Sequence, residues 1–219
     1  MQMIDLSHTL EPDISLFSPK APPPQITAWM SHEESAATGI YQGCTCEITH
    51  VAFVTSCGTY LDSPFHFHPD RSSIEALDLT QLILPGIVID CTGIKSKAPI
   101  TPDFLSDQDI SGKAVLFHTG LSAAWKQPEY HTFPFLSLAT ARCLVDGGAK
   151  LAGVDCLVVD DPTDPQRPAH TTLLGSDVLI VENLTNLAQL PQQDFTFHAV
   201  PLKVKGAAAF PVRAYATIP

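Results

Sequence analysis

The chain has 219 residues, of which 45% are hydrophobic and 16% are charged, and its formal net charge is −11. These values are typical of one well-packed domain, residues 1–219, and the acidic balance argues against a nucleic-acid partner, because phosphates bind to basic surfaces. The first residues lack the features of a signal peptide, and no apolar run approaches the ~20 residues of a membrane span. We therefore expect a cytoplasmic protein with no membrane partner and with six reduced cysteines.

The N-terminal part is predicted to form short strands separated by irregular segments. A first strand covers residues 4–7, Pro19 to Pro24 form an extended loop rich in proline, and Ile26 to Met30 form a second strand. Within that strand, Trp29 either packs in the core or reaches a ligand. Residues 46–54 are rich in β-forming residues. Their pattern predicts four buried side chains, which are Cys46, Ile48, Val51 and Phe53.

The remaining chain alternates apolar strands with short helices. Two continuous apolar runs, Gly86 to Cys91 and Ala114 to His118, suit strands that are buried on both faces. Thr101 and Ser137 are suited to cap two helices, the second of which ends at Gly147. Further elements are strands at residues 153–155 and 157–160, a helical turn at 170–174, and strands at 178–182, 195–200 and 212–218. Because strands outnumber helices and the longer helices lie between strands, we predict a single α/β domain with a mixed sheet.

Residues 56–68 combine small residues, a carboxylate and two imidazoles between apolar runs. Gly58 and Pro64 disfavour a regular strand or helix through the whole segment, so we predict a tight, irregular loop that holds Asp62 and His66 in fixed positions. An unpaired carboxylate is costly to bury. Asp62 therefore lies at the surface or contacts a cation, and the alternative is a solvated turn without a functional role.

Two later segments supply residues that could complete a site with Asp62. His170 follows a polar, proline-rich loop, and Glu182 ends a strand that is otherwise apolar. Such an acid often only marks the exit of a strand to solvent. Together, however, Asp62, His170 and Glu182 form a chemically sensible ligand set for a divalent metal such as zinc or manganese, with an open position for water. His66 would then act as a general base or acid.

The segment around Asp62 resembles the signature of the cyclase family that includes the bacterial kynurenine formamidases. That signature reads roughly His-Thr-Gly-Thr-His-Val-Asp-Ala-Pro-x-His-Phe. The likeness extends over nearly the whole chain, with matching segments in the order of the family. These segments are residues 4–8, 117–120, 153–155, His170, 181–187, 201–206 and 211–214. On this ordered series, the chain is identified as a member of the family.

The resemblance implies a swivelling β/β/α fold, a homodimer or homotetramer, and metal-dependent hydrolysis of a small-molecule amide. By position, Asp62, His170 and Glu182 match metal ligands of the family, and His66 matches its catalytic histidine. If no metal binds, the carboxylates of Asp62 and Glu182 would repel each other, and one of them would have a raised pKa.

The chain departs from the family where two signature histidines that bind metal are replaced by Ser56 and Tyr60. The loss of two imidazoles predicts a metal that is held weakly or not at all, and it favours manganese or magnesium over zinc. Tyr60 could offer its phenolic oxygen as a ligand or as a hydrogen-bond donor, so it is a second catalytic candidate. His50, His68 or Cys57 could replace a lost ligand, although none has the spacing of the family.

Three functions remain open. The leading hypothesis is a metal-dependent amide hydrolase resembling arylformamidase, which converts N-formylkynurenine to kynurenine and formate in tryptophan catabolism. The second is a metal-poor or metal-free relative that binds a small carboxylate or amide, or that hydrolyses a different amide or lactone. The third is a hydrolase without metal chemistry, in which His66 acts as base and Tyr60 as donor. Metal content separates the first hypothesis from the other two.

Overall fold

The computed structural model describes residues 1–219 and contains one sheet of nine strands. These strands are β1 (Gln2–Asp5), β4 (Tyr60–Asp62), β5 (Ile83–Asp90), β7 (Ala114–His118), β9 (Leu151–Val154), β10 (Leu179–Glu182), β11 (Phe195–His198), β12 (Ala209–Pro211) and β13 (Tyr215–Ile218). Their order in the sheet is β1-β13-β11-β5-β7-β9-β10-β4-β12. The central strands β5, β7, β9 and β10 pair in parallel, and all other neighbours pair antiparallel. The predicted α/β domain with a mixed sheet is therefore confirmed.

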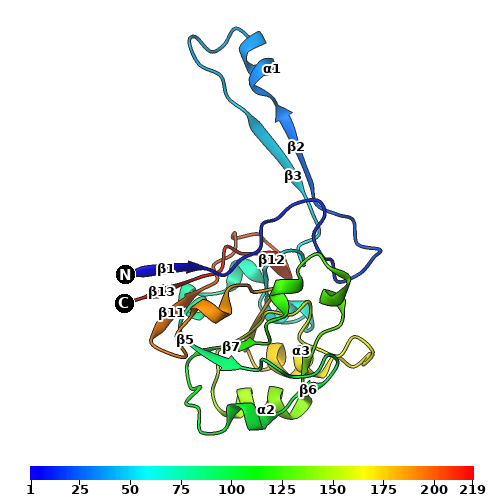
Figure 1. Ribbon diagram of the computed structural model, residues 1–219. Helices are drawn as coiled ribbons and strands as arrows, with labels where there is room; N and C mark the ends of the chain where they lie inside the picture. The colour runs from blue at the N-terminus through cyan, green and yellow to red at the C-terminus, as the bar shows by residue number, and fades with distance from the viewer.

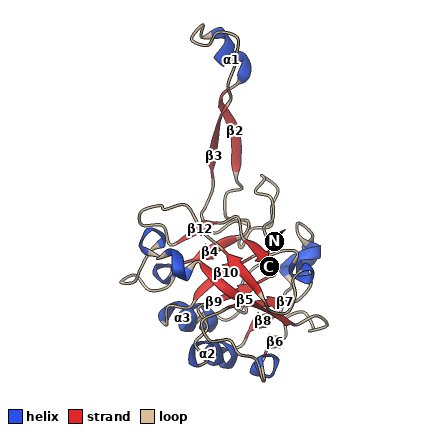
Figure 2. Ribbon diagram, turned by 90° about the vertical axis from the view of Figure 1, so that its left-hand side faces the viewer, coloured by secondary structure: helices blue, strands red, loops and turns tan.

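Hydrophobic side chains cover both faces of this sheet. In β5, neighbouring residues belong to different buried clusters: Ile87 to one of 24 residues and Val88 to one of 20. This alternation is that of a strand buried on both faces, as its apolar run predicted. The helices α2 (Leu138–Asp146) and α3 (Pro168–Gly175) contribute residues to the larger cluster, and both lie on the same side of the sheet (Figures 1 and 2).

Shorter elements surround this core. The hydroxyl of Ser137 caps α2 by accepting a hydrogen bond from the Thr140 N–H at 3.1 Å, as predicted. Strands β6 (Pro99–Ile100) and β8 (Phe135–Leu136) pair with each other outside the main sheet. The 3-10 helices are η1 (Pro64–His66), η2 (Ile74–Ala76), η3 (Leu79–Gln81), η4 (Pro102–Leu105), η5 (Leu121–Ala124), η6 (Pro128–His131) and η7 (Leu187–Gln189). No helix has the length and hydrophobicity that crossing a bilayer requires.

A hairpin projects from the body of the molecule, as Figures 1 and 2 show, and we call residues 25–52 the arm. It consists of β2 (Gln25–Met30), α1 (His32–Ala37) and β3 (Ile48–Ala52). Strands β2 and β3 pair only with each other. The side chain of Ser31 accepts a hydrogen bond from the Glu34 N–H, and the side chain of Glu34 accepts one from the Ser31 N–H. This reciprocal cap fixes where α1 begins, at the far end of the arm.

The arm contradicts two predictions about burial. Ile48 and Val51 were predicted to be buried, but they are 43% and 44% exposed. Trp29 is 68% exposed, so it does not pack in the core. Cys46 and Phe53 are half-buried. The β pattern predicted the strand correctly, but no second layer of the same chain covers this ribbon.

Two further segments differ from their predicted conformation. Residues 56–68 were predicted to be an irregular loop throughout, but they contain β4, which pairs with both β10 and β12. Gly58, with a φ of +62°, and Pro64 lie outside β4 and limit its length. Residues 157–160 were predicted to be a strand but are not one, because the chain leaves the sheet after β9 and turns toward the start of α3.

Candidate active site

The five predicted site residues converge where β4 meets β10. The register of these strands places Tyr60 directly opposite Glu182. Asp62 is two residues from Tyr60 on β4, so both side chains leave the same face of the strand. His66 ends η1, just after β4, and His170 lies in the first turn of α3, which packs against β10 and η1. The predicted convergence of these separated segments is therefore present in the structure.

Asp62 is the most unusual of these groups. Its side chain is fully buried, and neither carboxylate oxygen has a hydrogen-bond partner. The nearest imidazole nitrogens are Nε2 of His66, 3.7 Å from Oδ1, and Nε2 of His170, 3.8 Å from Oδ2. Atoms spaced in this way can bind one ion together, since each ligand lies about 2.0–2.2 Å from a zinc ion. Because an unpaired buried carboxylate is costly, the residues present fit a bound cation.

His170 is oriented by Asp160. Nδ1 of His170 lies 2.6 Å from Oδ2 of Asp160, and the same carboxylate accepts hydrogen bonds from the N–H groups of Ala169 at 2.6 Å and His170 at 3.0 Å. With Nδ1–H donating to Asp160, Nε2 is free to act as a ligand. Nε2 also lies 3.5 Å from Oε1 of Glu182. Burial alone lowers the pKa of His170, but the hydrogen bond to Asp160 and the nearby carboxylates raise it to about 10.

Glu182 and Tyr60 form a buried pair beside this group. The Tyr60 hydroxyl donates to Oε2 of Glu182, and the N–H of Val159 donates to Oε1 at 2.7 Å. Burial raises the pKa of Glu182 to about 7, with the charge of His170 opposing and that of Asp62 adding to the shift. Burial and the nearby carboxylates also raise the pKa of Tyr60 well above its usual value, so the phenol stays protonated.

The geometry favours a different set of metal ligands from the set that the family resemblance implies. Ligating atoms of Asp62, His66 and His170 all lie within 4.8 Å of one another. Both oxygens of Glu182, in contrast, already accept hydrogen bonds from protein donors. Whether Glu182 or His66 is the third ligand, and whether His66 and Tyr60 are catalytic, stay predictions.

None of the three proposed replacement ligands joins this cluster. His50 lies on β3, in the exposed arm. Nε2 of His68 lies 3.0 Å from the carbonyl oxygen of Thr171, so it is used in packing η1 against α3. Cys57 is buried, and this burial raises the pKa of its thiol to about 11, which disfavours the thiolate that a metal requires.

The cluster opens into a pocket of about 270 Å³. His66, Tyr60, His170 and Glu182 all line it, and His66 is the most accessible of the candidate ligands, with 29% of its side chain exposed. The ring of Phe67 stacks on that of His170, with 4.6 Å between centroids. The other lining residues are Phe17, Ser56, His131, Phe133, Leu157, Val158, Pro162 and Arg167.

Sequence reasoning missed two supporting residues. Asp160 was assigned to a strand, and its spacing from His170 carries no sequence signal, although ligand histidines commonly donate to a carboxylate. Asn183 follows Glu182 with a φ of 58°. Its side chain donates to the carbonyl oxygen of Gly58 at 2.8 Å and accepts from the Tyr130 hydroxyl at 2.9 Å. It therefore ties the end of β10 to the segment that precedes β4.

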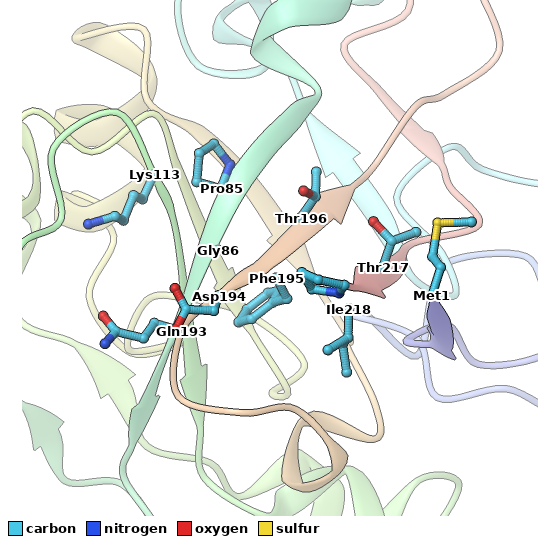
Figure 3. A pocket seen from close by; sticks show the side chains of 11 residues that line it. Met1, Pro85, Gly86, Lys113, Gln193, Asp194, Phe195, Thr196, Thr217 and Ile218 are labelled. Atoms are coloured by element: carbon cyan, nitrogen blue, oxygen red, sulfur yellow. The ribbon is translucent and has the colours of Figure 1, made fainter.

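A larger hollow of about 530 Å³ lies beside β5, β11 and β13, strands that do not adjoin β4 or β10 in the sheet (Figure 3). Its charged side chains are Lys113 and Asp194, and Lys113 is already paired with Asp109 at 2.7 Å. None of the predicted site residues lines it. The candidate active site is therefore the smaller pocket.

Comparison with known proteins gives the same assignment. Residues 4–161, more than half of the chain, match the family model Cyclase, whose description is "Putative cyclase". This chain belongs to the cyclase family. The resemblance that the sequence motifs indicated is therefore confirmed.

Relatives in this family align with almost the whole chain. The kynurenine formamidase of Geobacillus thermodenitrificans is 32% identical over 216 residues, which cover 96% of this chain and 95% of that protein. The kynurenine formamidase of Salinibacter ruber is 29% identical over 218 residues, which cover 98% and 96%. The predicted enzyme class, a hydrolase acting on C–N bonds other than peptide bonds, is confirmed.

Solved structures confirm the cyclase-type fold. Isatin hydrolase A from Ralstonia solanacearum matches with a TM-score of 0.88 at 22% identity, over 100% of this chain and 92% of that chain. A protein described as a predicted metal-dependent hydrolase from Bacillus stearothermophilus matches with a TM-score of 0.76 at 25% identity, over 98% and 97%.

Proposed function

We propose that this protein hydrolyses the amide bond of a small aryl amide such as N-formylkynurenine, with one bound manganese or zinc ion. The observation that carries the proposal is the carboxylate of Asp62, which is buried without a hydrogen-bond partner between the imidazoles of His66 and His170. The relatives named kynurenine formamidase and isatin hydrolase support it, since both names refer to aryl amides. The lining rings of Phe67 and Phe133 suit an aromatic ligand.

We assign the ion to Asp62, His66 and His170. When bound, a divalent ion would supply Lewis acidity and lower the pKa of water toward neutrality. The alternative follows the family pattern, with Asp62, His170 and Glu182 as ligands and His66 as the base. The first set is favoured because both oxygens of Glu182 are engaged by Tyr60 and Val159.

In this assignment, Tyr60 and Glu182 transfer a proton to the leaving amine. In the structure the Tyr60 hydroxyl donates to Oε2 of Glu182. In turnover, a protonated Glu182 would donate to the Tyr60 oxygen while the Tyr60 hydroxyl gives its own proton to the amine that leaves, so that Glu182 ends as the carboxylate. The apolar side chains of Phe133 and Leu157 line the same pocket, and each is 4% exposed. The hydrogen bond between Asp160 and His170 keeps the imidazole in one orientation during turnover.

The test is Asp62→Asn, which keeps the shape of the side chain and removes its charge. We expect the purified wild-type protein to contain about one equivalent of manganese or zinc and to hydrolyse N-formylkynurenine or isatin. The variant should lose the metal and at least about 100-fold in kcat/KM, because a ligand carboxylate is gone. Asp70→Asn, an exposed acid two residues after the segment 56–68, is the control and should change neither. A variant with unchanged metal content and turnover would refute the assignment.

A second candidate function follows from Ser56 and Tyr60, which stand where the family has two ligand histidines. It is a relative that binds a small carboxylate or amide without a metal and without hydrolysis. This candidate predicts no metal in the wild-type protein, even after incubation with excess manganese and zinc, and ligand binding that survives in Asp62→Asn.

We also infer that the protein is a homodimer or homotetramer and that the arm takes part in assembly. An isolated two-stranded ribbon is marginally stable in water. On the arm, however, Ile26, Trp29, Ile48 and Val51 are 41%, 68%, 43% and 44% exposed. Apolar side chains of this size gathered on one projecting ribbon favour contact with a second copy of the chain.

A further inference from the structure

We propose that Arg167 binds an anionic group of the substrate, so that the pocket is selective for aryl amides that carry a carboxylate. The proposal rests on the proposed function and adds the chemical class of the substrate. It concerns a side chain that belongs neither to the signature around Asp62 nor to the candidate metal cluster.

Arg167 is positioned at the same pocket as His170. It immediately precedes α3, three residues before His170, and both residues line the pocket. Arg167 itself is the N-cap residue of α3, with a φ of 46°, and it shares the pocket lining with His170. The guanidinium donates from Nη1 to the carbonyl oxygen of Asp161 at 3.1 Å and from Nη2 to that of Pro162 at 3.4 Å. The side chain is therefore held along its own loop at the pocket wall instead of extending into solvent.

The charge of Arg167 has no carboxylate partner. Every ion pair of an arginine or lysine within 4.0 Å involves Arg71, Lys113, Lys126 or Arg213. The neighbouring acid, Asp161, turns its carboxylate to Thr163, whose N–H and hydroxyl both donate to it at 2.8 Å. The two carbonyl contacts of Arg167 leave further guanidinium donors free for a ligand.

Arg167 places a positive charge at the pocket of an acidic protein. Arg167 is the only arginine or lysine that lines the pocket, whereas the whole chain has a net charge of −11. Distant charges are screened beyond about 8 Å at physiological salt, so the nearest charge decides whether an anion binds. A guanidinium pairs with a carboxylate through two parallel hydrogen bonds, which adds both affinity and orientation.

The side chains of Phe67 and Phe133 line the same pocket as Arg167 and His170. Phe67 stacks on His170 with an interplanar angle of 25°, and Phe133 is only 4% exposed. A ligand that fills this pocket therefore meets aromatic side chains, the imidazole of His170 and the guanidinium of Arg167. The compound 2-formamidobenzoate carries the formamide, the ring and the carboxylate in one small molecule.

The experiment compares a matched anionic and neutral ligand, 2-aminobenzoate and 2-aminobenzamide, by calorimetry on the metal-containing protein. Wild type should bind the acid at least about tenfold more tightly than the amide, as expected for one charge-assisted pair. Arg167→Gln should lower the affinity for 2-aminobenzoate by about tenfold to 100-fold and change the affinity for 2-aminobenzamide by less than about threefold. Arg142→Gln, an exposed arginine on α2, should change neither.

Equal affinity of wild type and Arg167→Gln for 2-aminobenzoate would overturn the proposal, as would an equal loss for both ligands. Arg167→Lys keeps the charge without the planar fork and should retain part of the preference for the acid. If the thermal midpoint shows that Arg167→Gln is unfolded, Arg167→Lys replaces it in the comparison. Turnover of 2-formamidobenzoate is measured separately. Its absence would count against the proposed hydrolysis, while the binding comparison still decides the role of Arg167.

Discussion

Tyr60 and Glu182 are 122 residues apart in the chain, yet they lie directly opposite each other on β4 and β10, and the Tyr60 hydroxyl donates to Oε2 of Glu182. This contact occupies the carboxylate that the family resemblance assigns to the metal. Tyr60 stands at a position where the family signature has a histidine. The structure thus retains one group of residues suited to a metal, which consists of Asp62, His66 and His170.

Tyr60→Phe should destabilise the protein by about 1–3 kcal/mol, because it leaves a buried carboxylate oxygen of Glu182 without its donor. Urea unfolding measures this loss. Tyr130→Phe is the matched control, since it removes a hydrogen bond from a buried phenol to the neutral side chain of Asn183. The control should cost about 0.5–1.5 kcal/mol. A loss for Tyr60→Phe no larger than that for the control would contradict the importance of the pair.

His66→Ala should reduce the affinity for manganese or zinc at least about tenfold, because it removes one of three ligands. The matched control is His68→Ala, two residues further on, whose ring contacts the carbonyl oxygen of Thr171 and not the cluster. Metal content is measured by elemental analysis after dialysis. Full retention of metal in His66→Ala, combined with loss in Glu182→Gln, would favour the alternative ligand set with Glu182.

Asp160→Asn should weaken metal binding by about 10-fold to 100-fold, because the carboxylate no longer holds Nδ1 of His170. The same change weakens the cap of α3, which should cost about 0.5–2 kcal/mol. Calorimetric titration with manganese and urea unfolding measure the two effects. Asp164→Asn, on the same loop and without contact to His170, should change neither.

In protein stripped of metal by a chelator, the free energy of unfolding should fall as the pH rises from about 5 to 9. Burial raises the pKa of Glu182 from 4.5 to about 7, and the carboxylates around His170 raise its pKa from 6.5 to about 10 despite burial. Both groups therefore hold protons in the folded state at pH values where the unfolded chain has released them. Linkage then requires that stability decrease as the pH rises through these two intervals.

Added metal should reverse this trend, since its ligands must be deprotonated and it competes with the proton on His170. Urea unfolding at pH 6 and pH 9, with chelator and with saturating manganese, checks both statements. Chelated protein that is more stable at pH 9 than at pH 6 would be the opposite of the expected result.

Replacement of residues 26–51 of the arm by a short Gly-Ser linker should shift the protein to a monomer in light scattering. Trp29→Ser should weaken assembly, because it removes the most exposed aromatic side chain of the arm. The control is Leu202→Ser, which changes a leucine that is 69% exposed on the body. If the protein without the arm has the same number of subunits as the wild type, the arm has no part in assembly.

Much of the fold could be predicted from the sequence, because the signals are local. The apolar run of β7, Ala114 to His118, gives the strand at its observed bounds, and Ser137 marks the start of α2. Both depend on neighbours within a few residues, through side-chain alternation and capping. The family signature likewise marked Asp62 and His66 in advance, and the ordered series of family segments marked His170 and Glu182, since both tie chemistry to short motifs.

The tertiary structure decided what depends on partners far along the chain. Ile48 and Val51 follow a pattern typical of a half-buried strand, but they are exposed because nothing in the chain packs on the arm. Residues 157–160 have a strand composition, yet Asp160 turns away to hold His170. Composition and spacing by themselves determined the class of the domain and the candidate residues. The hydrogen-bond partners of Tyr60, Glu182 and His170, and hence their roles, depend on contacts that form only when distant strands pair.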